Sequence, residues 1–118
     1  MQVSTPEATA VDLVRYAEHG GSWSNVAEVL VDLAKKIDPD RLADAARLDD
    51  DLAAAQRLGF LLEKAGAGDK AGSLLRWVEA EQPRTVSLRP DRPAAGAVRN
   101  SKWRLLVNEE IEDAGSRH

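Results

Sequence analysis

The stretch Leu52–Ala65, LAAAQRLGFLLEKA, has the densest aliphatic content of the chain. At about 100° per residue, its leucines and most of its alanines fall on one half of a helix, together with Gly59. Phe60 falls on the other half among polar residues, so we expect a second layer to cover it there. Gly59 costs about 1 kcal/mol relative to alanine in a helix interior, a cost that the close approach of another backbone would offset. The stretch therefore predicts a central, buried helix.

A capping box, STPE, predicts the first helix of the chain. In this motif the Ser4 hydroxyl accepts from the backbone N–H of Glu7, and the Glu7 carboxylate accepts from the N–H of Ser4. The helix begins at residue 5 and ends near His19, because two glycines follow.

Three further helices are expected from capping residues placed before periodic apolar positions. They run from Ser22 or Ser24 to about Ile37, from Asp38-Pro39 to Leu48, and onward from an Asp69 cap. Together with the first and central helices they make about five. The predicted fold class is α+β and mainly helical, in a single domain over residues 1–118.

After Gln82-Pro83, proline, arginine and β-branched residues replace the alanine-rich helical composition. Residues 85–88 and 103–107 read as two strands, while prolines and a glycine exclude regular structure from much of 89–102. The two strands are expected to pack on the helices as a hairpin, or to belong to a sheet whose other strands come from elsewhere. Residues 109–118 read as a polar tail.

The composition excludes several classes of function. The 118 residues contain no cysteine and two histidines, so neither thiolate metal sites nor a histidine-based centre is expected, and no cofactor. No phosphate-binding glycine loop and no nucleophile with a general base is present, so we do not expect an enzyme. Neither a membrane span nor a signal peptide is found, and cytoplasm is the simplest compartment.

Charge is unevenly distributed along the chain. Residues 83–108 carry six basic residues against one acid, a net charge of +5, so the rest of this −4 chain carries −9. The basic segment either neutralises the protein's own acidic helices, or faces phosphates or an acidic partner. For the second case the best candidates for contact with a partner or phosphate are Arg89, Arg92, Lys102 and Arg104.

A polar stripe on the first helix is a second candidate site. Thr9, Asp12 and Tyr16 are spaced by three and four residues, so they line up opposite the apolar side. The stripe either contacts an adjoining segment or partner, or is a solvated helix face.

Four motifs occur in a fixed order: VSTPEATAVDLVRY, QRLGFLLE, SLRP and WRLLVN. In combination they resemble the C-terminal domain of AbiEi-type antitoxins, over roughly residues 3–108. The positions matching the family motifs are Ser4, Thr5, Pro6, Glu7, Thr9, Asp12, Arg57, Leu58, Gly59, Leu88, Arg89, Pro90, Trp103, Arg104 and Asn108. Most of them are expected to be architectural: Arg57 would pair with a carboxylate behind the central helix, and Trp103 would cover Phe60.

The resemblance implies a bacterial antitoxin of a type IV toxin-antitoxin system, of the kind that acts in abortive infection and phage defence. Its partner would be a nucleotidyltransferase-like toxin, with direct contact left open. Operator DNA would be bound only through an N-terminal winged helix-turn-helix domain outside this chain, and the two parts together would repress the operon. The residues leave two alternatives open: a helical scaffold for protein contacts, or a nucleic-acid-binding module using residues 83–108. The oligomeric state is not predicted.

Overall fold

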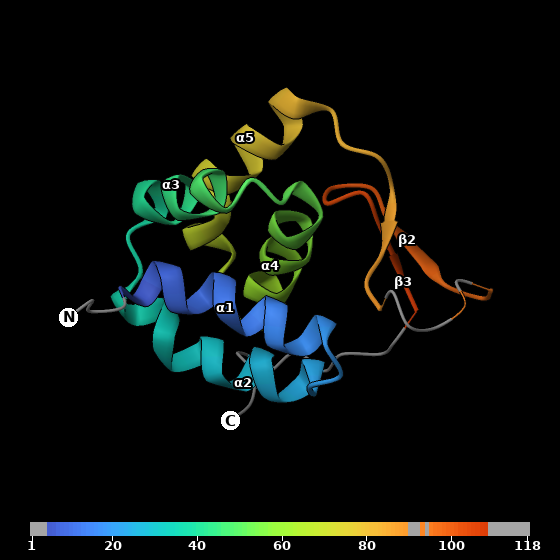
Figure 1. The fold of residues 1–118 in the computed structure, drawn as a ribbon, viewed down its shortest axis with the longest axis horizontal. Coiled ribbons are helices and arrows are strands. Elements are labelled where there is room, and N and C mark those ends of the chain that lie inside the picture. The colour runs from blue at the N-terminus through green and yellow to red at the C-terminus, as the bar shows by residue number, and fades with distance from the viewer. Residues whose placement is uncertain (1–4, 90–92, 94, 109–118) are drawn as a thin grey trace.

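The computed structural model describes residues 5–89, 93 and 95–108. Within them, five α-helices precede a small sheet (Figure 1), which confirms the mainly helical α+β class. The helices are α1 Pro6–Glu18, α2 Trp23–Leu33, α3 Pro39–Asp49, α4 Leu52–Lys64 and α5 Gly72–Glu81, with short 3₁₀ turns η1 Ala34–Lys36 and η2 Gly68–Ala71. No helix in this described part combines the length and apolar character that crossing a bilayer requires.

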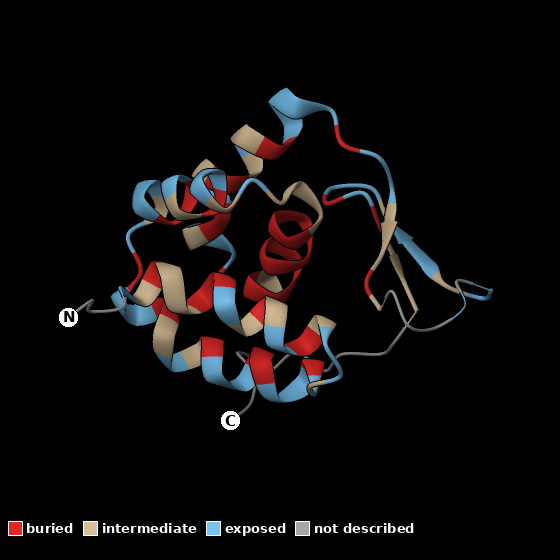
Figure 2. Cartoon of the chain, in the orientation of Figure 1, coloured by how far each residue is buried: buried red, intermediate tan, exposed pale blue. Residues whose placement is uncertain are grey.

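The central position of α4 follows from its sequence. It contacts α1, α2, α3 and α5, and every residue from Ala54 to Leu62 is buried (Figure 2). Phe60 is only 4% exposed and belongs to the core cluster although it lies on the more polar half of the helix. The expected second layer on that half is therefore present.

Short polar side chains fix the starts of three helices. The Ser22 hydroxyl accepts from the N–H of Asn25 at 3.2 Å, which settles the choice between the two serines. Asp38 and Asp51 cap α3 and α4 in the same way. Each of these side chains satisfies a backbone donor that the first helical turn leaves unpaired.

The expected capping box at the start of α1 is wrong. Thr5 is the N-cap and accepts from the N–H of Ala8 at 3.0 Å. The buried Glu7 carboxylate instead accepts from the N–H of Asp38 at 2.8 Å, and so ties α1 to the start of α3. Ser4 lies outside the described residues. The Asp69 cap is also wrong, because that residue lies in η2 and α5 begins at Gly72 without a side-chain cap.

The described residues hold three strands, one more than expected. β1 Val86–Ser87 and β3 Leu105–Val107 match the two predicted strands, but they pair in parallel and therefore form no hairpin. The additional strand is β2 Val98–Asn100, which pairs antiparallel with β3 and gives the order β1-β3-β2. β2 lies in the stretch from which proline and glycine appeared to exclude regular structure.

The sheet has an inner and an outer face. Leu88 and Leu105 are buried in the core, and Val86 and Val107 pack against it. Side chains alternate between the two faces along a strand. The register places Ser87, Leu106 and Arg99 side by side, so this row forms the outer face, turned away from the core.

Candidate functional site

Residues 83–89 and 95–108, which we call the β element, lie beside α4 (Figure 1). One side of α4 holds this element through four residues, which we call the anchor face: Gln56, Arg57, Gly59 and Glu63. The last three lie one, three and seven residues after Gln56, so all four fall on the same half of the helix circumference, which also contains Phe60.

Gln56 holds three points of the β element at once. Its side chain is 1% exposed, and its Nε2 donates to the backbone carbonyls of Arg84 and Trp103 at 3.0 Å each and of Arg104 at 3.2 Å. These carbonyls belong to the segment before β1 and to the segment entering β3. A single buried amide therefore fixes the start of the parallel strand pair against α4.

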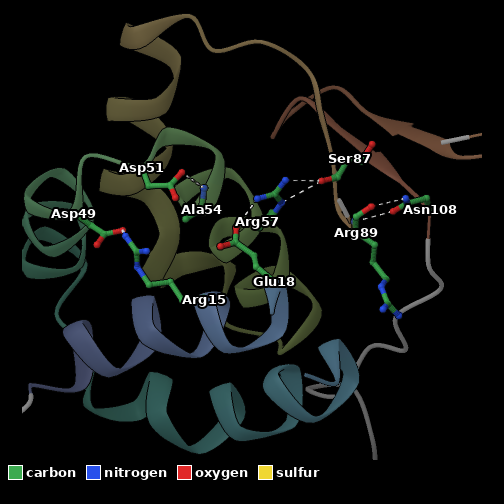
Figure 3. A network of polar contacts seen from close by, with 9 residues as sticks. All are labelled: Arg15, Glu18, Asp49, Asp51, Ala54, Arg57, Ser87, Arg89 and Asn108. Atoms are coloured by element: carbon green, nitrogen blue, oxygen red, sulfur yellow. Dashed lines mark hydrogen bonds and ion pairs between the residues drawn. The ribbon is translucent and has the colours of Figure 1, made fainter. Parts of the chain in front are cut away.

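Arg57 closes the outer edge of β1. Its Nε and Nη2 donate to the carbonyl oxygen of Ser87 at 3.1 and 3.0 Å. Its Nη1 pairs with the Glu18 carboxylate at the end of α1, as Figure 3 shows. The expectation that Arg57 pairs with a carboxylate is confirmed, and the same guanidinium joins α1, α4 and the sheet.

Gly59 provides space for an aromatic ring. A Cβ at this position would overlap the ring of Trp103, which is fully buried. The close approach at Gly59 therefore involves an indole ring and not a second backbone, and Trp103 packs on Gly59, where we had expected it to cover Phe60. The Trp103 Nε1 donates to Glu63 at 2.9 Å, and Lys102 pairs with the same carboxylate oxygen at 2.5 Å.

The predicted basic contact residues have different environments. Lys102 is half-exposed and paired with Glu63. Arg104 is exposed, but its Nη1 donates to the Pro83 carbonyl at 3.0 Å. The backbone of Arg89 is held at both its N–H and its carbonyl by the Asn108 side chain, at 2.8 and 2.9 Å (Figure 3). Arg92 lies outside the described residues. Part of the basic segment is therefore structural.

Two cations of the β element that were not selected from the sequence have no side-chain partner in the described chain. Arg84 and Arg99 are exposed, and no hydrogen bond or ion pair of either side chain is found within the described residues. Arg99 lies on the outer face of the sheet. No sequence signal separates these arginines from Arg104, because the difference depends on which carbonyls the folded β element presents. Self-neutralisation by the acidic helices accounts for Lys102 but not for Arg84 and Arg99.

The polar stripe on α1 lies at the surface. Asp12 and Tyr16 are exposed and Thr9 is half-buried. Tyr16 is 61% exposed, yet its ring covers Gly21 so closely that a Cβ there would overlap it. The structure brings none of the three residues to the β element, so the stripe forms a separate surface.

Three consecutive aspartates before α4 have separate structural roles. Asp49 pairs with Arg15 of α1 at 2.5 Å, Asp50 has left-handed backbone dihedrals at the end of α3, and Asp51 caps α4. The hydrogen bond to Asp49, and then its charge, raise the pKa of Arg15 above its ordinary value. The described residues contain no group of three potential metal ligands.

A family model for the AbiEi antitoxin C-terminal domain matches residues 1–64. The match covers more than half of the 118 residues and spans α1 to α4, including the anchor face, but it stops before the β element. A search of curated proteins and a search of solved structures each gave no significant match. The chain belongs to the AbiEi antitoxin C-terminal domain family.

Proposed function

We propose that this domain is the effector part of a type IV antitoxin and neutralises a nucleotidyltransferase-like toxin. The observation that carries the proposal is the family match over α1 to α4. In the proposal the domain is not an enzyme and works by contact. Operon repression would use it together with a winged helix-turn-helix domain outside the 118 residues, which alone would bind operator DNA.

The β element is the part of the domain that fits a contact role. The exposed side chains of Arg84 and Arg99 have no partner within the described residues. Arg104 is also exposed, and its Nη1 donates to the carbonyl of Pro83, the residue before Arg84. Association between proteins is steered by complementary charge, and guanidinium groups bind carboxylates with two parallel hydrogen bonds. We therefore propose that this surface binds an acidic patch of the toxin. Arg84 and Arg99 join the contact residues that were selected from the sequence.

The test is a growth-rescue assay in bacteria that co-express this chain with the nucleotidyltransferase-like toxin encoded beside it. The informative variant reverses both free cations, Arg84→Glu with Arg99→Glu. The matched control reverses two exposed cations of the helical body, Lys36→Glu with Arg41→Glu. Rescue by the wild type and the control, with loss of rescue in the first variant, would support the proposal.

Two outcomes would contradict it. Failure of the folded wild-type chain to rescue growth would remove the antitoxin role from this domain. Rescue by the Arg84→Glu, Arg99→Glu variant at wild-type level would leave the role but move the contact away from the β element.

The exposed cations also favour a second candidate, a nucleic-acid-binding module. Arginines that face solvent without a protein partner suit contacts to phosphates. In that case the affinity for an oligonucleotide would fall steeply with salt, since each neutralised phosphate releases a counterion. A titration of single-stranded and duplex oligonucleotides at several salt concentrations distinguishes this candidate, because a contact with the toxin alone predicts no such binding.

A further inference from the structure

A groove between α3 and α5 belongs neither to the β element nor to the polar stripe on α1. It has a volume of about 410 Å³ and is lined by Asp40, Ala43, Asp44 and Arg47 of α3 and by Ser73, Arg76, Trp77 and Ala80 of α5. Such a volume is in the range of sites that hold one or two side chains or a small ligand. The lining carries two acids and two arginines, so the groove has no net charge.

One end of the groove is closed by side chains. The Ser73 hydroxyl donates to the Asp40 carboxylate at 2.6 Å, and the Arg76 Nη2 donates to the Ser73 hydroxyl at 3.1 Å. Asp40 and Ser73 are each the second residue of their helix, so this chain of bonds ties the two helix starts together. The groove therefore extends from the tied starts toward Arg47 and Ala80 near the helix ends.

An exposed apolar side chain follows the last α3 residue of the lining, Arg47, in the sequence. Leu48 is 88% exposed, the most of any large hydrophobic residue in the described chain. It lies four residues after Asp44, so it is on the same side of α3 as the acids of the groove. Trp77 in the lining is half-buried and packs against the core cluster. Tryptophan and arginine, which the lining supplies at Trp77, Arg47 and Arg76, are enriched at protein interfaces.

We propose that this groove is the contact surface between two copies of the chain, related by a two-fold axis. In a two-fold contact the same patch serves both copies, so each residue must meet its complement. The patch offers one such pair, since Asp44 lies on α3, where Arg47 accompanies it, while Arg76 lies on the facing helix. Asp44 of one copy meets Arg76 of the other, twice, and Leu48 of each copy enters the other's groove against Trp77.

The charges of the groove favour a second copy over an anionic ligand. A phosphate or carboxylate bound by Arg47 and Arg76 would lie beside Asp40 and Asp44 and be repelled by them. Within the described part of the chain, the Asp44 carboxylate pairs only with the Arg47 side chain one turn away, at 3.6 Å. The carboxylate is largely exposed, so it is available to a partner. The groove alone is small, and the exposed Leu48 adds apolar surface on α3 to the contact.

Sedimentation velocity of the 118-residue chain over a range of concentrations tests the proposal. The wild type should show a reversible monomer–dimer equilibrium, and Leu48→Asp should raise the dissociation constant at least about tenfold. Val29→Asp, at an exposed apolar position of α2 outside the groove, is the matched control and should leave the equilibrium unchanged. Circular dichroism should show that both variants keep their helices, because the two positions are exposed.

A charge-swap pair makes the test specific for self-association. Asp44→Arg and Arg76→Asp should each weaken the dimer, because each places like charges opposite one another at both symmetric contacts. An equimolar mixture of the two variants restores both contacts and should recover association. A wild type that stays monomeric at all concentrations, or a mixture that associates no better than its components, would overturn the proposal. Loss of toxin neutralisation by Leu48→Asp in a monomeric chain would assign the groove to the toxin instead.

Discussion

The helical body and the β element of this domain are held by different kinds of interaction. The body is built on aliphatic burial: Leu30, Leu58, Leu61 and Leu74 are each no more than 1% exposed and belong to one continuous core. The β element has short strands and adds only Leu88, Trp103 and Leu105 to that core. Its other links to α4 are a few specific polar contacts, above all those of the Gln56 amide and the Arg57 guanidinium.

The difference predicts two levels of stability in one domain. Hydrophobic burial is spread over many residues, whereas each contact of the anchor face is unique and has no substitute. Regions that depend on few contacts open locally before the whole protein unfolds. We therefore expect the body to tolerate loss of the β element better than the β element tolerates loss of any one anchor.

The largest effect is expected from Trp103→Ala. The variant removes a fully buried indole and its bond to Glu63, and aromatic truncations of this kind cost about 3–5 kcal/mol. Hydrogen exchange should show loss of protection in β1 and β3 while α1 to α5 stay protected. Leu61→Ala is the control in the body, where protection should fall in all elements together. Equal loss of protection everywhere in Trp103→Ala would show that the two regions are one cooperative unit.

A smaller effect, about 1–3 kcal/mol, is expected from Gly59→Ala, because the added methyl group overlaps a packed ring. The sign of the change in the free energy of unfolding is informative, because alanine favours a helix interior over glycine by about 1 kcal/mol. Gly72→Ala is the matched control: it lies in α5 with nothing near its Cβ position, and it should be neutral or slightly stabilising. Chemical denaturation of both variants gives the comparison. A stabilised Gly59→Ala protein would mean that Trp103 can leave α4 at little cost.

Asp51→Ala should cost about 1 kcal/mol, because the N–H of Ala54 loses its cap. This change weakens the start of the central helix without touching the anchor face, so the fall should appear in the global melting temperature and not as selective opening of the β element. Asp51→Asn keeps a capping oxygen and should restore most of the loss. Selective opening of the β element in Asp51→Ala would contradict the division into two regions.

The same division explains what the sequence could predict. The helices were found because aliphatic spacing and caps such as Asp38 and Asp51 are local signals, and most of them are confirmed in place. β2 was missed because Val98–Asn100 is three residues long and largely exposed, with no alternating pattern to detect. The parallel pairing of β1 with β3 was missed because the sequences of two strands far apart in the chain do not indicate how they pair.

The sequence indicated the types of residue that form the site but not their partners. Arg57 pairs with a carboxylate as expected, whereas the close approach expected at Gly59 is made by the Trp103 ring and not by a backbone. The identity of both partners, Glu18 and Trp103, depends on the packing of distant segments. For the cations, the sequence indicates a basic segment and not which guanidinium groups remain free. That outcome depends on where backbone carbonyls such as that of Pro83 lie after folding.

The smallest effect on stability, and the sharpest on function, is expected from Arg84→Ala with Arg99→Ala. Both side chains are exposed, so the free energy of unfolding should change by no more than about 0.5 kcal/mol per site. Under the proposed function, rescue of growth from the toxin should nevertheless weaken. Arg104→Ala is the contrasting variant: Arg104 has a φ of 53° and donates to Pro83, so its loss disturbs the β element itself. A stable Arg104→Ala chain with full rescue, beside an equally active Arg84→Ala, Arg99→Ala chain, would show that the basic character of the β element serves neither its folding nor the toxin.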